Sequence, residues 1–163
     1  MKRLGILCAF ALTLAGCLTA SGQRKLIDTV NEAQLSAAQT YDTAKALQAS
    51  AQTACGAALR EKTMPMPTPD TARATCAAIG VPLPYDPVKL QHAAGPIGAL
   101  YDAVRYANTQ RLSANGDTPA AVLGGLVGAF EAVLADLTGA GITVPASLTN
   151  AVQTVKAATG GPK

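Results

Sequence analysis

Few side chains in this sequence could carry out a reaction. His92 is the only histidine, and it lies beside Gln91 and two alanines, while no serine stands in a Gly-x-Ser-x-Gly setting. A catalytic nucleophile needs a base within hydrogen-bonding distance, and the sequence indicates no such pair. The ten acidic residues form no evident metal or glycosidase arrangement. We therefore predict no catalytic residue, no cofactor and no enzymatic activity.

Cysteine is the remaining residue type with distinctive chemistry, and one of the four cysteines follows an unusual N-terminal segment. Met1-Lys2-Arg3 is a short basic region, and an uncharged apolar stretch runs from Leu4 to Leu14. This combination is typical of a signal peptide. The stretch is much shorter than the roughly 20 apolar residues that span a bilayer, so a permanent transmembrane helix is the less favoured alternative.

The apolar stretch ends in Leu14-Ala15-Gly16-Cys17, which resembles the lipobox of bacterial lipoproteins. The resemblance implies cleavage between Gly16 and Cys17, a diacylglyceryl group on the Cys17 sulfur, and often a further acyl chain such as palmitate on the new amino group. Two chains give stable membrane attachment, because each buried methylene contributes roughly 0.8 kcal/mol. The alternative is an ordinary secreted protein that is cleaved after Leu18-Thr19-Ala20.

The residue after the lipidated cysteine bears on sorting. In lipoproteins of Gram-negative bacteria an aspartate at this position tends to retain the protein in the inner membrane, whereas this chain has Leu18. The resemblance thus implies attachment to the outer membrane, on its periplasmic side. A Gram-positive source would void that rule.

Two further cysteines, Cys55 and Cys76, remain in the mature chain that this resemblance implies. In an oxidising periplasm they most simply form one disulfide. Closing a loop of about twenty residues would contribute on the order of 3 kcal/mol. The alternatives are a catalytic thiol or a metal site, but two thiolates and His92 fall short of a tetrahedral ligand set. We predict the disulfide and no metal site.

Composition sets limits on the partners of the mature domain. Without Lys2 and Arg3, the mature chain has eleven of the thirteen basic residues and ten acidic residues, so its net charge is close to +1. No basic patch is interleaved with aromatic residues, which argues against nucleic-acid binding. Alanine dominates and tryptophan is absent. Since each alanine buries little area, the helices must approach closely and the core should be thin.

The longest predicted element is a helix over residues 24–62, which contains no proline and a single glycine, Gly56. Apolar and small residues recur along it at alternating spacings of three and four, typical of a heptad pattern. They are Ile27, Val30, Gln34, Ala37, Tyr41, Ala44, Gln48, Ala51, Cys55 and Ala58. We favour packing of this seam against the apolar helix around Leu126 of the same chain. The alternative is that the seam forms the contact of an oligomer, in which Gln34 and Gln48 would fix the register.

Prolines and glycines divide the rest of the chain into shorter helices. Asp70 is expected to cap a short helix to about Ile79 that carries Cys76, and Asp86-Pro87 to start a helix to about Leu112 that Gly95-Pro96 should kink or divide. Thr118-Pro119 starts the most apolar helix, through about Leu137. Its Gly124 and Gly128 would let another helix approach closely, and its Glu131 and Asp136 favour a core helix over a membrane span. Val144-Pro145 starts the last helix, to about Thr159, and a turn is expected at residues 113–116.

These elements predict an all-α fold, a small bundle of about four main helices with a long N-terminal helix and one short disulfide-tethered helix. The expected organisation is a signal peptide (1–16), a lipidated tether (17–23), one helical domain (24–160) and a tail (161–163). Inward-facing residues are expected on three helices: Leu90, Ile97, Tyr101, Val104 and Leu112 on the first, Val122, Leu123, Leu126, Val127, Phe130, Val133, Leu134 and Leu137 on the second, and Leu148, Val152 and Val155 on the last.

The function expected from these features is that of a non-catalytic, membrane-anchored module that binds another protein. A lipid anchor, a small helical bundle and one disulfide are together similar to secretin pilotins, by architecture only. One alternative is a phage- or prophage-encoded envelope lipoprotein that acts in superinfection exclusion or lysis. Another is a structural envelope protein that forms a homo-oligomer through residues 24–62.

Overall fold

The computed structural model describes residues 20–113 and 120–158, and within these ranges it forms helices joined by turns and extended linkers, without a strand. The predicted all-α class is confirmed. The six helices are α2 (Ala20–Glu61), α3 (Pro69–Ala78), α4 (Pro87–His92), α5 (Ala94–Ser113), α6 (Ala120–Gly139) and α7 (Ala146–Ala158). The predictions for residues 1–19, which include the leader, Cys17 and Leu18, lie outside the described residues, as do those for the turn at 114–116 and the tail.

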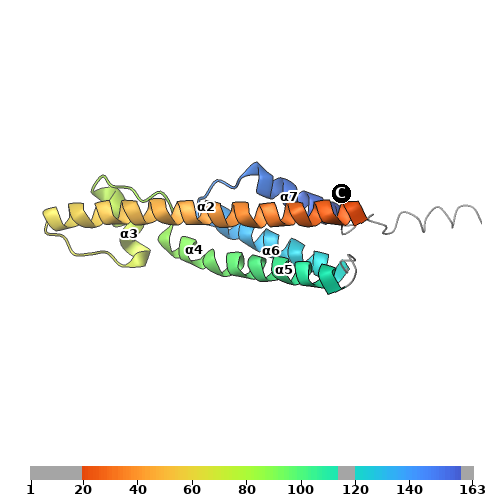
Figure 1. Ribbon diagram of the computed structural model, residues 1–163. Helices are drawn as coiled ribbons and strands as arrows, with labels where there is room; N and C mark the ends of the chain where they lie inside the picture. Colours follow the sequence, from red (N-terminus) through yellow and green to blue (C-terminus); the bar gives the residue numbers. More distant parts are fainter. Residues whose placement is uncertain (1–19, 114–119, 159–163) are drawn as a thin grey trace, which may run out of the picture.

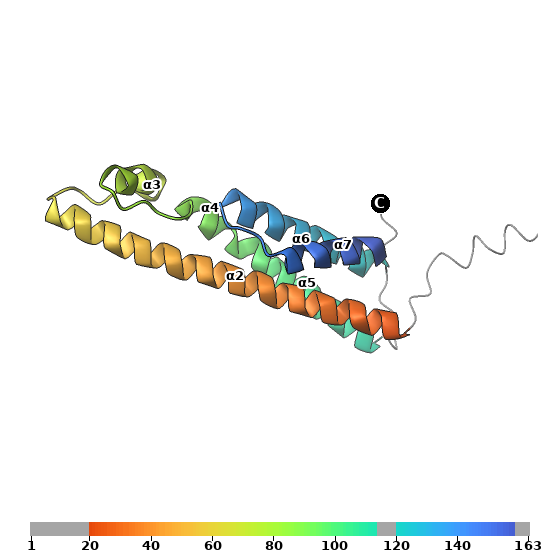
Figure 2. The same cartoon turned by 90° about the horizontal axis from the view of Figure 1, so that it is seen from above.

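Four helices form an antiparallel bundle in which each packs against two others (Figures 1 and 2). Around the bundle, α2 lies beside α5, α5 beside α6, α6 beside α7, and α7 beside α2. The start of α2 and the end of α7 therefore lie at one end of the molecule. Because α2 is 42 residues long, it continues past the bundle, and α3 and the linkers that flank it lie beside its far end (Figure 1).

The buried face of α2 follows most of the predicted seam and departs from it at Gln34 and Ala58. Val30, Ala37 and Ala44 are buried as predicted, whereas Ala33 is buried in place of Gln34, and Leu59 in place of Ala58, which are half-buried. A straight α-helix has 3.6 residues per turn, so a strict 3.5-residue pattern drifts around it by about 20° per heptad. Following the helix geometry moves the buried position by one residue at these two places, while Ile27 and Cys55, near the two ends of the seam, are buried as predicted. The helix also begins at Ala20, before the predicted start at Arg24.

The seam of α2 packs inside this chain. Leu26, Val30 and Ala37 belong to one core cluster with Leu126 and Phe130 of α6, as the favoured interpretation predicted. The flanking polar side chains pair with the two neighbouring helices. Asn108 of α5 donates to Asn31 (3.1 Å), and the hydroxyls of Ser36 and Ser147 of α7 lie 3.3 Å apart.

The helix that starts at Asp86-Pro87 is divided as predicted. Asp86 caps α4 by accepting hydrogen bonds from the N–H groups of Val88 and Lys89 (3.0 and 3.1 Å). The break at Ala93 has a local cause, because Pro96 has no N–H to donate to the carbonyl of His92 and its ring crowds that carbonyl. Beyond the break, one member of the predicted face was wrong: Tyr101 is 54% exposed, and Leu100 is fully buried in its place, whereas Val104 is buried as predicted.

The core face of α6 was predicted well, but its glycines do not lie where we expected. Leu123, Leu126, Phe130, Val133 and Leu137 are buried, and Leu148, Val152 and Val155 of α7 pack on the same core. Gly124 and Gly128 are exposed, however, and no described atom of another helix lies within 4 Å of where a Cβ would be. The predicted close approach of another helix is therefore wrong within the described chain.

One segment of α6, Ala121–Gly139, is long and apolar enough to cross a membrane by length and composition. Its core-facing residues pack in the bundle, and Glu131 on its outer side forms an ion pair with Lys156 of α7. This pairing of a charged group in α6 with the neighbouring helix matches the role of a core helix, which the sequence also favours.

Candidate functional site

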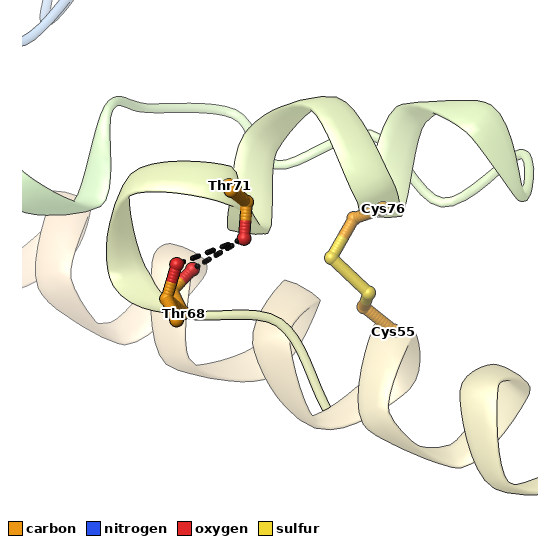
Figure 3. Close-up of a disulfide and its surroundings, with 4 residues drawn as sticks. All are labelled: Cys55, Thr68, Thr71 and Cys76. Atoms are coloured by element: carbon orange, nitrogen blue, oxygen red, sulfur yellow. Dashed lines mark hydrogen bonds between the residues drawn. A yellow bond between two sulfur atoms is a disulfide. The ribbon is translucent and has the colours of Figure 1, made fainter. Parts of the chain in front are cut away.

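The far end of the molecule is built around the predicted disulfide, which the structure confirms. Cys55 of α2 and Cys76 of α3 are joined, with their Cα atoms 5.6 Å apart, and both are 2% exposed (Figure 3). They belong to a second hydrophobic cluster, separate from the bundle core, which we call the tip cluster. Its buried members are Cys55, Leu59, Ala72, Cys76 and Leu83. Such a small cluster buries little apolar area, so the disulfide contributes most of its stability.

Helix α3 begins slightly earlier than predicted. Its N-cap is Thr68, with Pro69 in the first turn, and Asp70 lies inside that turn. The hydroxyls of Thr68 and Thr71 lie 2.9 Å apart, which closes the first turn on its exposed side (Figure 3). Asp70 remains favourably placed, because a carboxylate near a helix N-terminus interacts with the positive end of the helix dipole. The predicted cap position was wrong by two residues, while the existence of the helix was right.

Two of the turns at the tip share the same backbone motif. At the end of α2, Met64 donates to the carbonyl of Leu59 and Thr63 to that of Arg60; after α3, Val81 and Gly80 form the equivalent pair of bonds with Cys76 and Ala77. This is the Schellman motif, in which the residue after the helix adopts a left-handed conformation. Gly80 adopts this conformation with φ of 84°, which is favourable because glycine has no Cβ. Thr63 adopts it with φ of 54° although it has a side chain. A β-branched residue in this region is strained.

Helix α2 contains two glycines, Gly22 and Gly56, and the second has a packing role. Gly56 is buried, and the Met66 Cε atom would lie 3.3 Å from a Cβ at this position. A glycine inside a helix costs about 1 kcal/mol relative to alanine. Because Gly56 has no side chain, the methyl group of Met66 in the proline-rich linker can pack against the backbone of α2.

Beside Met66 lies a cavity of about 290 Å³, which we call the tip cavity. Its walls come from α2, from α3, from the two linkers that flank α3 and from the start of α4, and among the described residues Gln52 is the one polar side chain that lines it. The apolar lining includes Leu59, Met66, Pro67, Pro69, Leu83 and Pro87 together with both cysteines. Met64 and Met66 are 41% and 64% exposed at this end of the molecule. A cavity with apolar walls and exposed thioethers suits adaptable contact with apolar groups of another molecule.

Gln48 lies between the tip cluster and the bundle core. It is only 3% exposed, and its Oε1 accepts a hydrogen bond from the backbone N–H of Tyr85 (3.1 Å), which ties the linker after α3 to α2. Its Nε2 has no hydrogen-bond partner among the described residues. Gln48 therefore acts within the chain, whereas Gln34, the other glutamine of the seam, is half-buried.

A second cleft, of about 390 Å³, opens between α2 and the loop that joins α6 to α7. Ser36, Gln39, Thr40, Thr43 and Thr143 contribute to its lining, together with Tyr85 and Pro145. The Thr40 and Thr43 hydroxyls donate to carbonyls of their own helix (both 2.8 Å), so they present mainly acceptor lone pairs to the cleft. The cleft holds no charged residue and no nucleophile paired with a base.

The remaining chemically active residues are dispersed. His92 is exposed and lines a shallow cavity with Lys89 and Asp136, without a hydrogen bond between them among the described atoms. Within residues 20–113 and 120–158, no three His, Cys, Asp or Glu side chains are grouped so that they could hold a metal ion. The sequence predicted the disulfide but not the tip cavity, because the cavity joins segments whose contacts no local pattern encodes.

Comparisons of this chain with protein-family models, with curated proteins and with solved structures find no match.

Proposed function

We propose that this chain is a lipid-anchored, non-catalytic protein-binding module of the bacterial cell envelope. In this proposal Cys17 carries the lipid, the leader is removed after Gly16, and the domain lies on the periplasmic side of the outer membrane. The lipobox-like residues Leu14 to Cys17 support the anchor. The architectural similarity to secretin pilotins belongs to the same proposal.

The observation that carries the binding role is the position of the tip cavity. Helix α2 begins at Ala20, close to Cys17 in the sequence, and its 42 residues span about 60 Å at 1.5 Å per residue. Helix α3 lies at the far end of this helix, beyond the bundle (Figure 2), and the tip cavity is lined by residues of both helices. An anchored chain would thus hold an apolar cavity well away from the membrane surface, where a partner could reach it. The partner we propose is a protein segment that presents apolar side chains.

The anchor is tested by mass and by two matched cysteine variants. The intact mature protein should begin at Cys17 and carry acyl chains. Cys17→Ser should release the protein from the membrane fraction, whereas Cys8→Ser, a change of the same type within the leader, should leave it attached. An unmodified N-terminus at Ser21 would refute the anchor.

The binding role is tested by photo-crosslinking in cells that produce the full-length chain. A photoreactive residue replaces Met64, beside the tip cavity, or Tyr106, a residue on the bundle that is even more exposed. We expect a discrete protein adduct from position 64 and none from position 106. Equal labelling at the two positions, or no adduct at 64, would contradict a binding site at the tip.

A further inference from the structure

The two methionines of the described chain lie together at one place, in the linker between α2 and α3. Met64 and Met66 alternate there with Pro65 and Pro67. Their exposed fractions, 41% and 64%, are large for an apolar residue type. A peroxide oxidises exposed methionine side chains before buried ones. The resulting sulfoxide can be reduced again by two classes of enzyme, one for each sulfoxide epimer.

The two side chains differ in what an oxidation would change. Met66 lines the tip cavity, and its methyl group lies against the backbone of Gly56. The sulfur is bonded directly to that methyl carbon, so a sulfoxide oxygen would be introduced beside an apolar wall that includes Leu59 and Leu83. Met64 does not line the cavity. Oxidation there adds a polar group to exposed linker without disturbing a packed contact.

We propose that Met66 is a reversible oxidation site that controls access to the tip cavity. In the reaction a peroxide oxygen is transferred to the thioether sulfur as the O–O bond breaks. The sulfur is oxidised by two electrons and the peroxide is reduced to water or an alcohol. The polar sulfoxide leaves the contact with Gly56 because it is better solvated in water than against apolar walls. The linker then moves away from α2, and the walls formed by Leu59 and Leu83 become more accessible. The inference builds on the proposed binding role of the tip, since it names the regulation of that same site.

The test uses the purified full chain, graded hydrogen peroxide and peptide mass analysis, with amide hydrogen exchange over residues 52–60 and 79–84 as the structural readout. Met64→Leu isolates the response of Met66, and Met66→Leu is the matched control that retains Met64. In Met64→Leu we expect oxidation of Met66 to raise exchange in both segments by at least about threefold, because few contacts other than the disulfide hold the tip. Methionine sulfoxide reductases should reverse the change. In Met66→Leu the same peroxide dose should leave exchange unchanged.

Two outcomes would overturn the proposal. One is that Met66 in Met64→Leu stays unoxidised at a dose that oxidises Met64 in Met66→Leu. The other is that Met66 is oxidised while exchange in both segments stays the same. Neither readout requires a partner, so a failure of the photo-crosslinking experiment and a failure of the oxidation response are separate results.

Discussion

Removing the disulfide should loosen the tip and leave the bundle intact. The bond closes a loop with a sequence separation of 21 residues. For a loop of this length the chain-entropy model gives about 3.3 kcal/mol, which corresponds to a change of about two hundredfold in an opening equilibrium. The tip cluster has only five buried members and is separate from the bundle core, so the loss should be confined to it.

The assay is amide hydrogen exchange on the Cys55→Ala/Cys76→Ala double variant. Protection of the α3 amides should fall by about two orders of magnitude, while amides of α6 near Phe130 keep their protection. The wild-type chain with its disulfide chemically reduced is the control, because it retains the sulfur atoms and so separates the loss of the bond from the loss of packed volume. An equal loss of protection in α3 and α6 would show that tip and bundle unfold as one unit, and unchanged protection in α3 would show that packing alone holds the helix. Either result would refute the reasoning.

Four further substitutions test three other parts of the structure. Thr63→Gly should relieve the strain of a left-handed residue at this position. The Met64 N–H, which donates to the carbonyl of Leu59, should then be protected from hydrogen exchange about fivefold more strongly, which corresponds to roughly 1 kcal/mol. Lower protection of this N–H would contradict the strain. Gln48→Ala leaves the half-buried N–H of Tyr85 without its acceptor and should lower the denaturant-derived free energy of unfolding by about 1–3 kcal/mol. A change of under about 0.5 kcal/mol would show that this hydrogen bond does not hold the linker to α2. Leu100→Ala should cost about 2–5 kcal/mol and Tyr101→Ala less than about 1 kcal/mol; the reverse order would contradict the observed register of α5.

Much of the local structure could be predicted because its signals are local. Pro69, Pro87 and Pro145 lie at the starts of helices α3, α4 and α7, and Asp86 caps α4 as expected. The Gly95-Pro96 pair divides a helix through the donor that proline lacks. These effects act over a few residues, so no tertiary contact is needed to infer them.

Faces rich in small residues were harder to predict than helix boundaries. Burying alanine or glycine changes the free energy little, so a sequence constrains the orientation of such a face weakly. The sequence predicted a close helix contact at Gly124 and Gly128, but both are exposed. No contact was predicted at Gly56, which packs against Met66. On α5 the strongly apolar Leu100 is buried and the amphipathic Tyr101 is exposed, a choice that depends on how α5 meets its neighbours.

The sequence by itself determined the all-α class, the division into helices and the pairing of Cys55 with Cys76, and it also supplies the lipobox-like residues on which the proposed anchor depends. Helix periodicity, the restrictions imposed by proline and the count of available cysteines are properties of the chain that need no knowledge of packing. Tertiary structure alone decided that α2 extends past the bundle and that Gln48 holds the linker at Tyr85. It also decided that Gly56, Met66 and Leu83 meet around one cavity. Those contacts join segments far apart in the sequence, and they form only where several weak packing preferences are satisfied together.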